Sequence, residues 1–235
     1  MSSWTAKKFW TDVSAVEVDG GFMVQLDKRP VKTPAKATLL VPTLALAQNI
    51  TAEWDAQDGV VKPETMPFTR SANAAIDKVT HQHAEVANMV ADYGDSDLLC
   101  YRADSPSELV ARQVKVWDPY LDWASEKFDA RLLPRVGVIH SPQDPQAIEK
   151  LRRLVHGFSA FELTAFHDLV GLSGSLILGL AAAYKHESPE TLWENSRVDD
   201  CWQAEQWGDD DEAIEAEAKK KSEFMHAANF FHLVK

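Results

Sequence analysis

The residue types best suited to chemistry gather in one stretch, "VDDCWQAEQWGDDDEA" at 198–213, which holds two tryptophans, one cysteine and seven carboxylates in sixteen positions. Carboxylates and thiolates can hold a metal ion or move protons, whereas tryptophan side chains favour burial against another protein. Three interpretations are therefore open: a metal site, an acid–base cluster, or a helix surface that a partner contacts. The first two would make the protein a carboxylate-dependent enzyme, such as a metal hydrolase.

Most of the negative charge belongs to the surroundings of this stretch. Between Glu187 and Glu217 there are twelve acidic residues against Arg197 alone, while the whole chain carries a net charge of -12. The rest of the chain is therefore close to neutral and offers no basic stripe to compensate. A nucleic acid would be repelled, so we expect no nucleic-acid partner.

Metal binding lacks the residue pattern that it needs. Glu223 and His226 form one Glu-x-x-His pair, but a di-metal site in a helical bundle needs two such pairs, and the sequence has no second one. His81 and His83 would point about 200° apart on a helix, so they cannot share a metal ion. We expect no metal site and no cofactor.

Other reactive residues favour structural interpretations. Asp95 and Asp97 in "DYGDSDLLCYR" are predicted to make turn hydrogen bonds, and Cys100 to be a buried structural thiol. Cys201 lies about a hundred residues further on without a CxxC pair, so both cysteines are predicted to be free thiols. "GLSGS" at 171–175 has the wrong glycine spacing for a nucleophile elbow and is predicted to pack closely within one buried helix over 169–184. No Gly-Lys-Ser/Thr phosphate loop, GxGxxG or HExxH occurs, so we expect no catalytic residues and no enzyme.

The tryptophans favour the partner interpretation without deciding it. On a single helix over 190–207, Trp193 and Trp207 would project within about 40° of each other and Trp202 on the opposite side. Such a helix is either central in a bundle or exposes one side to a partner, and both remain open. Glu205 shares the stripe of Trp202, where a carboxylate must either pair inside the fold or border an open surface, and the geometry leaves both outcomes open. The three aspartates at 209–211 follow Gly208 and are predicted to cap the next helix.

The elements that would position these residues change character near residue 68. "VSAVEV" and "FMVQLD" flank Asp19-Gly20-Gly21 and predict a hairpin, and a helix carries Leu46, Ile50 and Trp54 on one side. We therefore expect an α+β protein. Residues 1–68 would form a small domain with a twisted antiparallel sheet and a covering helix, and 69–235 a helical bundle.

Helix boundaries in the second part have clear local signals. Gly157 and Gly208 are predicted to end helices in a left-handed conformation. Predicted helix starts are Ser105-Pro106, Asp118-Pro119, Asp144-Pro145, Ser159 with Glu162, and Ser188-Pro189. The apolar run over 169–184 is too short to span a bilayer, and no leader precedes the first strand, so we expect a cytoplasmic protein without membrane insertion.

Taken together, several segments resemble a known family: "FMVQLDKRPVKTP", "LAQNITAEWDAQ", "MPFTRSANAAID", "DSDLLCYR" and "CWQAEQWGDDDEA". They are similar, in order and from about Phe9 to Ala218, to the chaperones that assemble the soluble catalytic sector of F-type ATP synthase. The resemblance to a bacterial member implies a small α/β domain before a helical one, no cofactor and no catalytic chemistry.

The resemblance also implies a partner. A chaperone of this kind binds the free, unassembled alpha subunit and prevents its aggregation until the beta subunit joins it. The family's functional region corresponds to Glu205, Trp207 and the neighbouring Trp202 and Trp193, with Trp54 in "EWDAQ" as a second position. The resemblance therefore implies that Glu205 borders an open surface that meets the partner rather than pairing inside the fold. We expect a monomer. A permanent structural subunit of a complex is the alternative to a transient chaperone.

Overall fold

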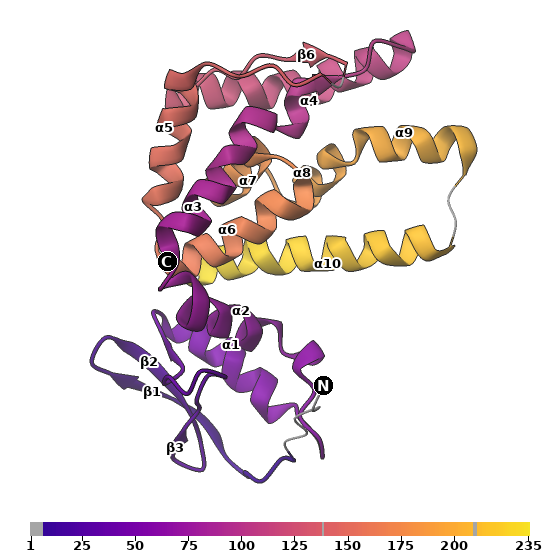
Figure 1. The fold of residues 1–235 in the computed structure, drawn as a ribbon. Coiled ribbons are helices and arrows are strands. Elements are labelled where there is room, and N and C mark those ends of the chain that lie inside the picture. The colour runs from indigo at the N-terminus through magenta and orange to yellow at the C-terminus, as the bar shows by residue number, and fades with distance from the viewer. Residues whose placement is uncertain (1–6, 138, 209–210) are drawn as a thin grey trace. The chain divides into compact units, whose positions relative to one another are not determined.

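The computed structural model describes residues 7–137, 139–208 and 211–235, and the chain divides into two compact units (Figure 1). Unit 1 comprises Met1–His83, Ser159–Ala165 and Asn229–Lys235, and unit 2 comprises Ala84–Phe158 and Phe166–Ala228. The expected division into 1–68 and 69–235 is continuous along the chain. In the structure, two short segments from late in the chain join the N-terminal unit instead.

Unit 1 contains the expected hairpin. β1 (Val13–Val18) pairs antiparallel with β2 (Gly21–Leu26), and β2 also pairs with the short strands β3 (Arg29–Pro30) and β4 (Leu40–Val41). Gly21 is required at the turn, because a Cβ atom there would lie 2.4 Å from the carbonyl oxygen of Val41. The fold class α+β is confirmed: a small antiparallel sheet precedes a helical region.

A covering helix packs on this sheet, as expected. α1 (Leu44–Asp55) begins at Thr43, whose hydroxyl accepts a hydrogen bond from the Leu46 N–H, and Leu46 and Ile50 are fully buried. The next turns are η1 (Pro63–Thr65), α2 (Pro67–Ala74) and the π-helical η2 (Ala75–Val79). Glu53 of α1 accepts hydrogen bonds from the N–H groups of Phe68 and Thr69, so its carboxylate caps α2.

Unit 2 is built around α7 (Leu176–Ala183), all of whose residues are buried. Around it the chain forms α3 (His83–Ala91), η3 (Asp92–Ser96), η4 (Leu98–Cys100), α4 (Ser107–Phe128), α5 (Pro145–His156), α6 (Ala160–Ser173), α8 (Pro189–Ser196), α9 (Val198–Trp207) and α10 (Asp211–Leu233). The first residues of α6 and the last of α10 belong to unit 1. β5 (Tyr101–Arg102) and β6 (Arg135–Val136) form a short parallel pair. Within the described part of the chain, none of the helices combines the length and the apolar character that a membrane span requires.

Several predicted helix ends are confirmed. Asp144 and Ser188 are N-caps, and Ser159 and Glu162 form a reciprocal capping box. Gly208 ends α9 with a φ of 80°, but the left-handed prediction for Gly157 is wrong, since its φ is -77°. The predicted cap at 209–211 lies partly outside the described residues.

The prediction of one helix over 169–184 is wrong, because the segment contains the end of α6 and the whole of α7. Gly174 has a φ of 72°, and the Ser175 hydroxyl accepts a hydrogen bond from the Leu178 N–H to start α7. Gly171 has no neighbour where its Cβ would lie, so close packing does not explain "GLSGS". Close helix packing occurs instead at Gly179, where a Cβ atom would lie 2.7 Å from Val170 Cγ2.

No helix starts at Asp118-Pro119, because α4 runs through this position. The Asp118 carboxylate accepts a hydrogen bond from the Arg102 guanidinium at 2.8 Å, and Trp117 and Tyr120 on either side of the dipeptide are buried. Packing around Pro119 therefore outweighs the loss of one helix hydrogen bond.

Candidate functional site

The acidic segment singled out in the sequence forms two helices rather than the single one predicted over 190–207. α8 ends at Ser196 and α9 begins at Val198, with Arg197 between them. The Asn195 carbonyl oxygen accepts a hydrogen bond from the Trp117 indole N–H of α4 at 2.7 Å. In a continuous helix this oxygen would instead accept a hydrogen bond from an N–H group of the same helix. The prediction that Trp193 and Trp202 lie on opposite sides of one helix is therefore wrong, because they belong to two helices.

α4 holds α9 through two adjacent side chains. The Arg112 guanidinium donates two parallel hydrogen bonds to the Glu205 carboxylate, at 2.7 and 2.8 Å, and lies 5.1 Å from the Trp202 ring centroid. Gln113, which is buried, donates to the Asp199 carboxylate at 2.7 Å. Both ends of α9 are thus attached to α4 by polar contacts.

The Arg112–Glu205 pair remains at the surface. The side chains are 35% and 50% exposed, respectively. Hydrogen bonding from Arg112 lowers the pKa of Glu205, and the same bond raises the pKa of Arg112, so both groups stay charged at neutral pH. Glu205 therefore is paired and also borders solvent, a combination that the sequence did not suggest. Solvent screening keeps the contribution of such a pair to stability small.

The predicted tryptophans lie in different environments. Trp193 on α8 is 1% exposed and packs against Phe224 with ring centroids 5.6 Å apart, so the structure offers no exposed surface at this position. Trp202 is half-buried, and Trp207, the last residue of α9, is 78% exposed. The structure brings Trp202 and Glu205 together around Arg112 and leaves Trp207 in solvent.

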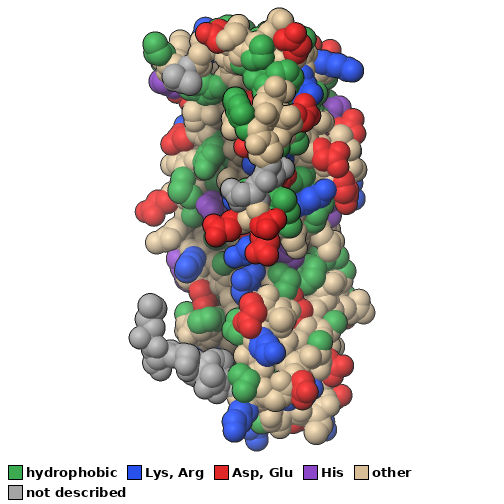
Figure 2. Space-filling view, turned by 90° about the vertical axis from the view of Figure 1, so that its right-hand side faces the viewer, with side chains coloured by type: hydrophobic (Ala, Val, Ile, Leu, Met, Phe, Trp, Pro, Cys, Tyr) green, Lys and Arg blue, Asp and Glu red, His purple; other side chains and the backbone are tan. Residues whose placement is uncertain are grey.

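α9 is an unusually exposed helix. Only Val198 among its ten residues is buried. The first turns of α10 are exposed throughout and include Ile214, a large apolar side chain. Figure 2 shows acidic side chains gathered on this face beside the ends of α9 and α10. This combined area, α9 with the first turns of α10, is called the α9 surface below.

Trp54 belongs to unit 1 and not to the α9 surface. It is half-buried on α1, and its ring meets that of Trp10 edge to face with centroids 5.2 Å apart. A role of Trp54 in partner contact stays a prediction.

The remaining reactive residues are distributed as single groups. The described residues contain no cluster of three His, Cys, Asp or Glu side chains that could hold a metal ion. Asp97 makes the predicted turn hydrogen bond with the Leu99 N–H and also accepts from Ser175 and Ile177, whereas Asp95 bonds to the distant Gln143 N–H. Cys100 is buried as expected, Cys201 is exposed, and both are free thiols in the structure.

Sequence reasoning missed the residues of α4 that position α9. Arg112 lies 93 residues before Glu205, and Gln113 lies 86 residues before Asp199. Neither belongs to a motif in the sequence. Arg112 stands in an ordinary amphipathic helix, so only the fold could identify it as the partner of Glu205.

Comparison with known proteins gives a consistent result. The family model described as ATP12 chaperone protein matches residues 7–125. The mitochondrial protein atp12 of Schizosaccharomyces pombe is 24% identical over 221 residues, which cover 89% of this chain and 76% of that protein. The crystal structure of Atp12 from Paracoccus denitrificans is 46% identical with a TM-score of 0.95, covering 98% of this chain and 99% of that chain. A crystal structure from Agrobacterium tumefaciens, of a protein described as a candidate chaperone, is 40% identical with a TM-score of 0.93, covering 98% and 87%.

Proposed function

Because the chain belongs to the ATP12 chaperone family, whose members serve ATP synthase assembly, we propose that it binds the unassembled alpha subunit of the catalytic sector. Binding keeps this subunit from aggregating until the beta subunit joins it. The protein acts as a cytoplasmic monomer and has no enzymatic activity.

The α9 surface is the proposed contact. The observation that carries this assignment is the exposure of Trp207, 78%, on a helix that buries only Val198. A large aromatic side chain in solvent costs free energy that burial in a complex would recover, and tryptophan is enriched where partners contribute most binding energy. The surrounding carboxylates would favour a partner surface with lysine and arginine side chains.

A holding mechanism follows from this arrangement. Complex formation would cover apolar surface of the free subunit, and mass action alone would release it when the beta subunit competes. The protein should therefore suppress light scattering by isolated alpha subunit without added ATP. Since charge complementarity contributes, capture should weaken as the salt concentration rises.

Charge reversal at Glu205 tests the assignment. Glu205→Lys removes the pair with Arg112 and places two cations together, but at a solvent-screened position, so we expect melting within roughly 2 °C of the wild type. Capture of purified alpha subunit should be lost, because the acidic surface loses a carboxylate next to Trp202.

A matched control is available on α5. Glu149 is also 50% exposed and pairs with an arginine, Arg153, at 2.9 Å. Glu149→Lys should leave both melting and capture unchanged. Normal capture by folded Glu205→Lys, or equal losses in both variants, would remove Glu205 from the partner site.

A further inference from the structure

The sheet of unit 1 has an open edge along β1. β1 pairs with β2 on one side only. The carbonyl oxygen of Val24 accepts a hydrogen bond from Val31 on the far side of β2, so Val24 and its β1 neighbour Ala15 form a pair without mutual hydrogen bonds. The N–H and C=O groups of Ala15, and of Val13 and Glu17 two residues away on either side, therefore point outward from the sheet. Outside the β1–β2 pairing, no backbone hydrogen bond from another described residue reaches these groups.

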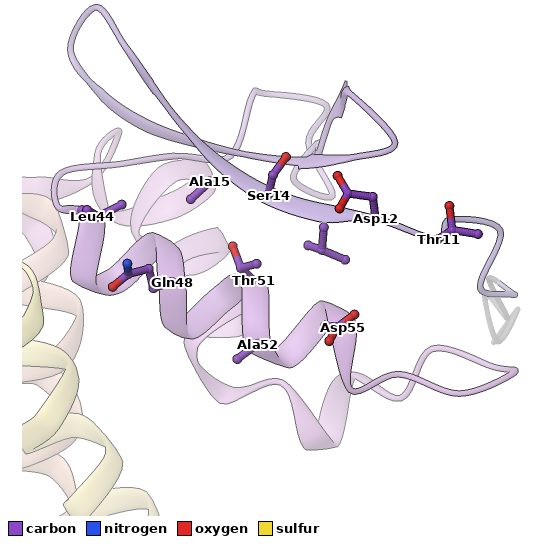
Figure 3. Close-up of a pocket in the computed structure, with 10 residues that line it drawn as sticks. Thr11, Asp12, Ser14, Ala15, Leu44, Gln48, Thr51, Ala52 and Asp55 are labelled. Carbon is purple, nitrogen blue, oxygen red and sulfur yellow. The ribbon is translucent and has the colours of Figure 1, made fainter.

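A groove runs beside this edge, between β1 and α1 (Figure 3). It has a volume of about 530 Å³ and is bordered on α1 by Leu44, Gln48, Thr51 and Asp55, which step by four, three and four residues and so share one side of the helix.

The two ends of the groove differ. Asp12 and Asp55 lie at one end, while Ala15 and the exposed Leu44 lie at the other. Neither carboxylate has an ion-pair partner among the described residues. The nearby Lys8 ammonium donates a hydrogen bond to the Asp55 carbonyl oxygen at 3.0 Å, so two carboxylates and one ammonium leave this end with a net negative charge. One end is therefore acidic and the other apolar.

We propose that β1 and this groove bind an extended segment of the alpha subunit, which adds a strand to the sheet. Its main chain would bond to the outward groups of Val13 and Ala15, a lysine or arginine side chain would lie between Asp12 and Asp55, and an apolar side chain would contact Leu44. The inference rests on the proposed function and adds a second contact, separate from the α9 surface.

The groups that line the groove indicate what kind of segment would bind there. Unpaired backbone groups along an edge are matched by the backbone of another strand, and this mode of recognition depends little on sequence. Two unpaired carboxylates select a cationic side chain at one position. An unassembled subunit exposes segments that the finished complex buries, so such a strand is available before assembly and is withdrawn after it.

Amide hydrogen exchange tests the strand directly. In the free protein, the outward amides of Val13, Ala15 and Glu17 should exchange rapidly, whereas those of Ser14 and Val16 are protected by β2. In the saturated complex with purified alpha subunit, exchange at Val13 and Ala15 should slow by at least about tenfold. Unchanged exchange at both amides in that complex would overturn the proposal.

Charge reversal tests the acidic end. Asp12→Lys with Asp55→Lys should weaken capture of the alpha subunit about tenfold at low salt. The control, Asp19→Lys with Glu64→Lys, changes the net charge equally at exposed positions outside the groove and should alter capture less than about twofold. Equal effects of the two double variants would also overturn the proposal.

The outcomes separate this inference from the proposed function. If wild-type protein captures the alpha subunit but the β1 amides stay unprotected, only the strand proposal fails. If wild-type protein does not capture the subunit, both fail. Protection that appears without the subunit, together with a doubled mass in solution, would assign the edge to a second copy of this chain and overturn the partner assignment.

Discussion

Two tryptophans of the acidic segment should respond in opposite ways to the same substitution. Trp193 is 1% exposed, stacks obliquely against Phe224, and lies under the Arg197 guanidinium at 5.0 Å. Trp207 is 78% exposed and ends its helix. Trp193→Ala should therefore change stability and Trp207→Ala should change binding.

The expected loss of stability in each variant follows from how deeply the tryptophan ring is buried. Replacing a fully buried tryptophan by alanine removes its packing and leaves a cavity, which costs about 3–5 kcal/mol. In a chain of this size each kcal/mol lowers the melting temperature by about 2–4 °C, so Trp193→Ala should melt about 6–20 °C below the wild type. Trp207→Ala removes little buried surface and should melt within roughly 2 °C of the wild type.

The assay combines thermal melts followed by circular dichroism with capture of purified alpha subunit well below both melting temperatures. Trp193→Ala should still capture the subunit while folded, and Trp207→Ala should not. A wild-type melting temperature for Trp193→Ala would show that the ring does not support the core of unit 2. Undiminished capture by Trp207→Ala would refute the assignment of the α9 surface.

Three further outcomes are expected. Gly179→Ala should lower the free energy of unfolding by about 1–3 kcal/mol, because the new Cβ would lie 2.7 Å from Val170 Cγ2; an unchanged denaturant midpoint would contradict this packing. Burial raises the pKa of Asp97 from 3.8 to about 6, so stability present below about pH 4 should be lost as the pH rises to about 6, by at most about 3 kcal/mol. Denaturant titrations should show that decrease in the wild type and not in Asp97→Asn. Cys201 should react with a thiol reagent in the folded protein, while Cys100, buried and with its pKa raised by burial, should react only after unfolding; two fast thiols would contradict the fold here.

Local signals in the sequence predicted those features that local hydrogen bonds determine. Asp144 and Ser188 each accept a bond from an N–H two or three residues away, and the β1–β2 hairpin depends on Gly21 at its turn. Each of these features can be recognised within a few residues of sequence, because both partners of the interaction lie there.

The errors occurred where a distant group outweighed a local preference. Pro119 remains inside α4 because the residues around it are buried and Asp118 is bound by Arg102. Instead of one helix over 190–207, α8 ends at Ser196. The indole N–H of Trp117 donates a hydrogen bond to the carbonyl oxygen of Asn195, 78 residues further along the chain. No window of sequence contains both members of such pairs, so periodicity alone could not locate these boundaries.

The candidate site is harder to predict than the fold for a related reason. A surface that binds a partner has few contacts within its own chain, and the low burial of α9, where only Val198 is buried, is what we expect of the surface proposed here. The exposed Trp207 is therefore not explained by packing within the chain, and the composition of this segment was a better guide to it than its periodicity. The interactions that do position α9, from Arg112 and Gln113 of α4, are polar contacts made far along the chain. Composition could thus indicate a candidate partner surface, but only the fold could show that Glu205 is held at the surface by an arginine 93 residues away in the sequence.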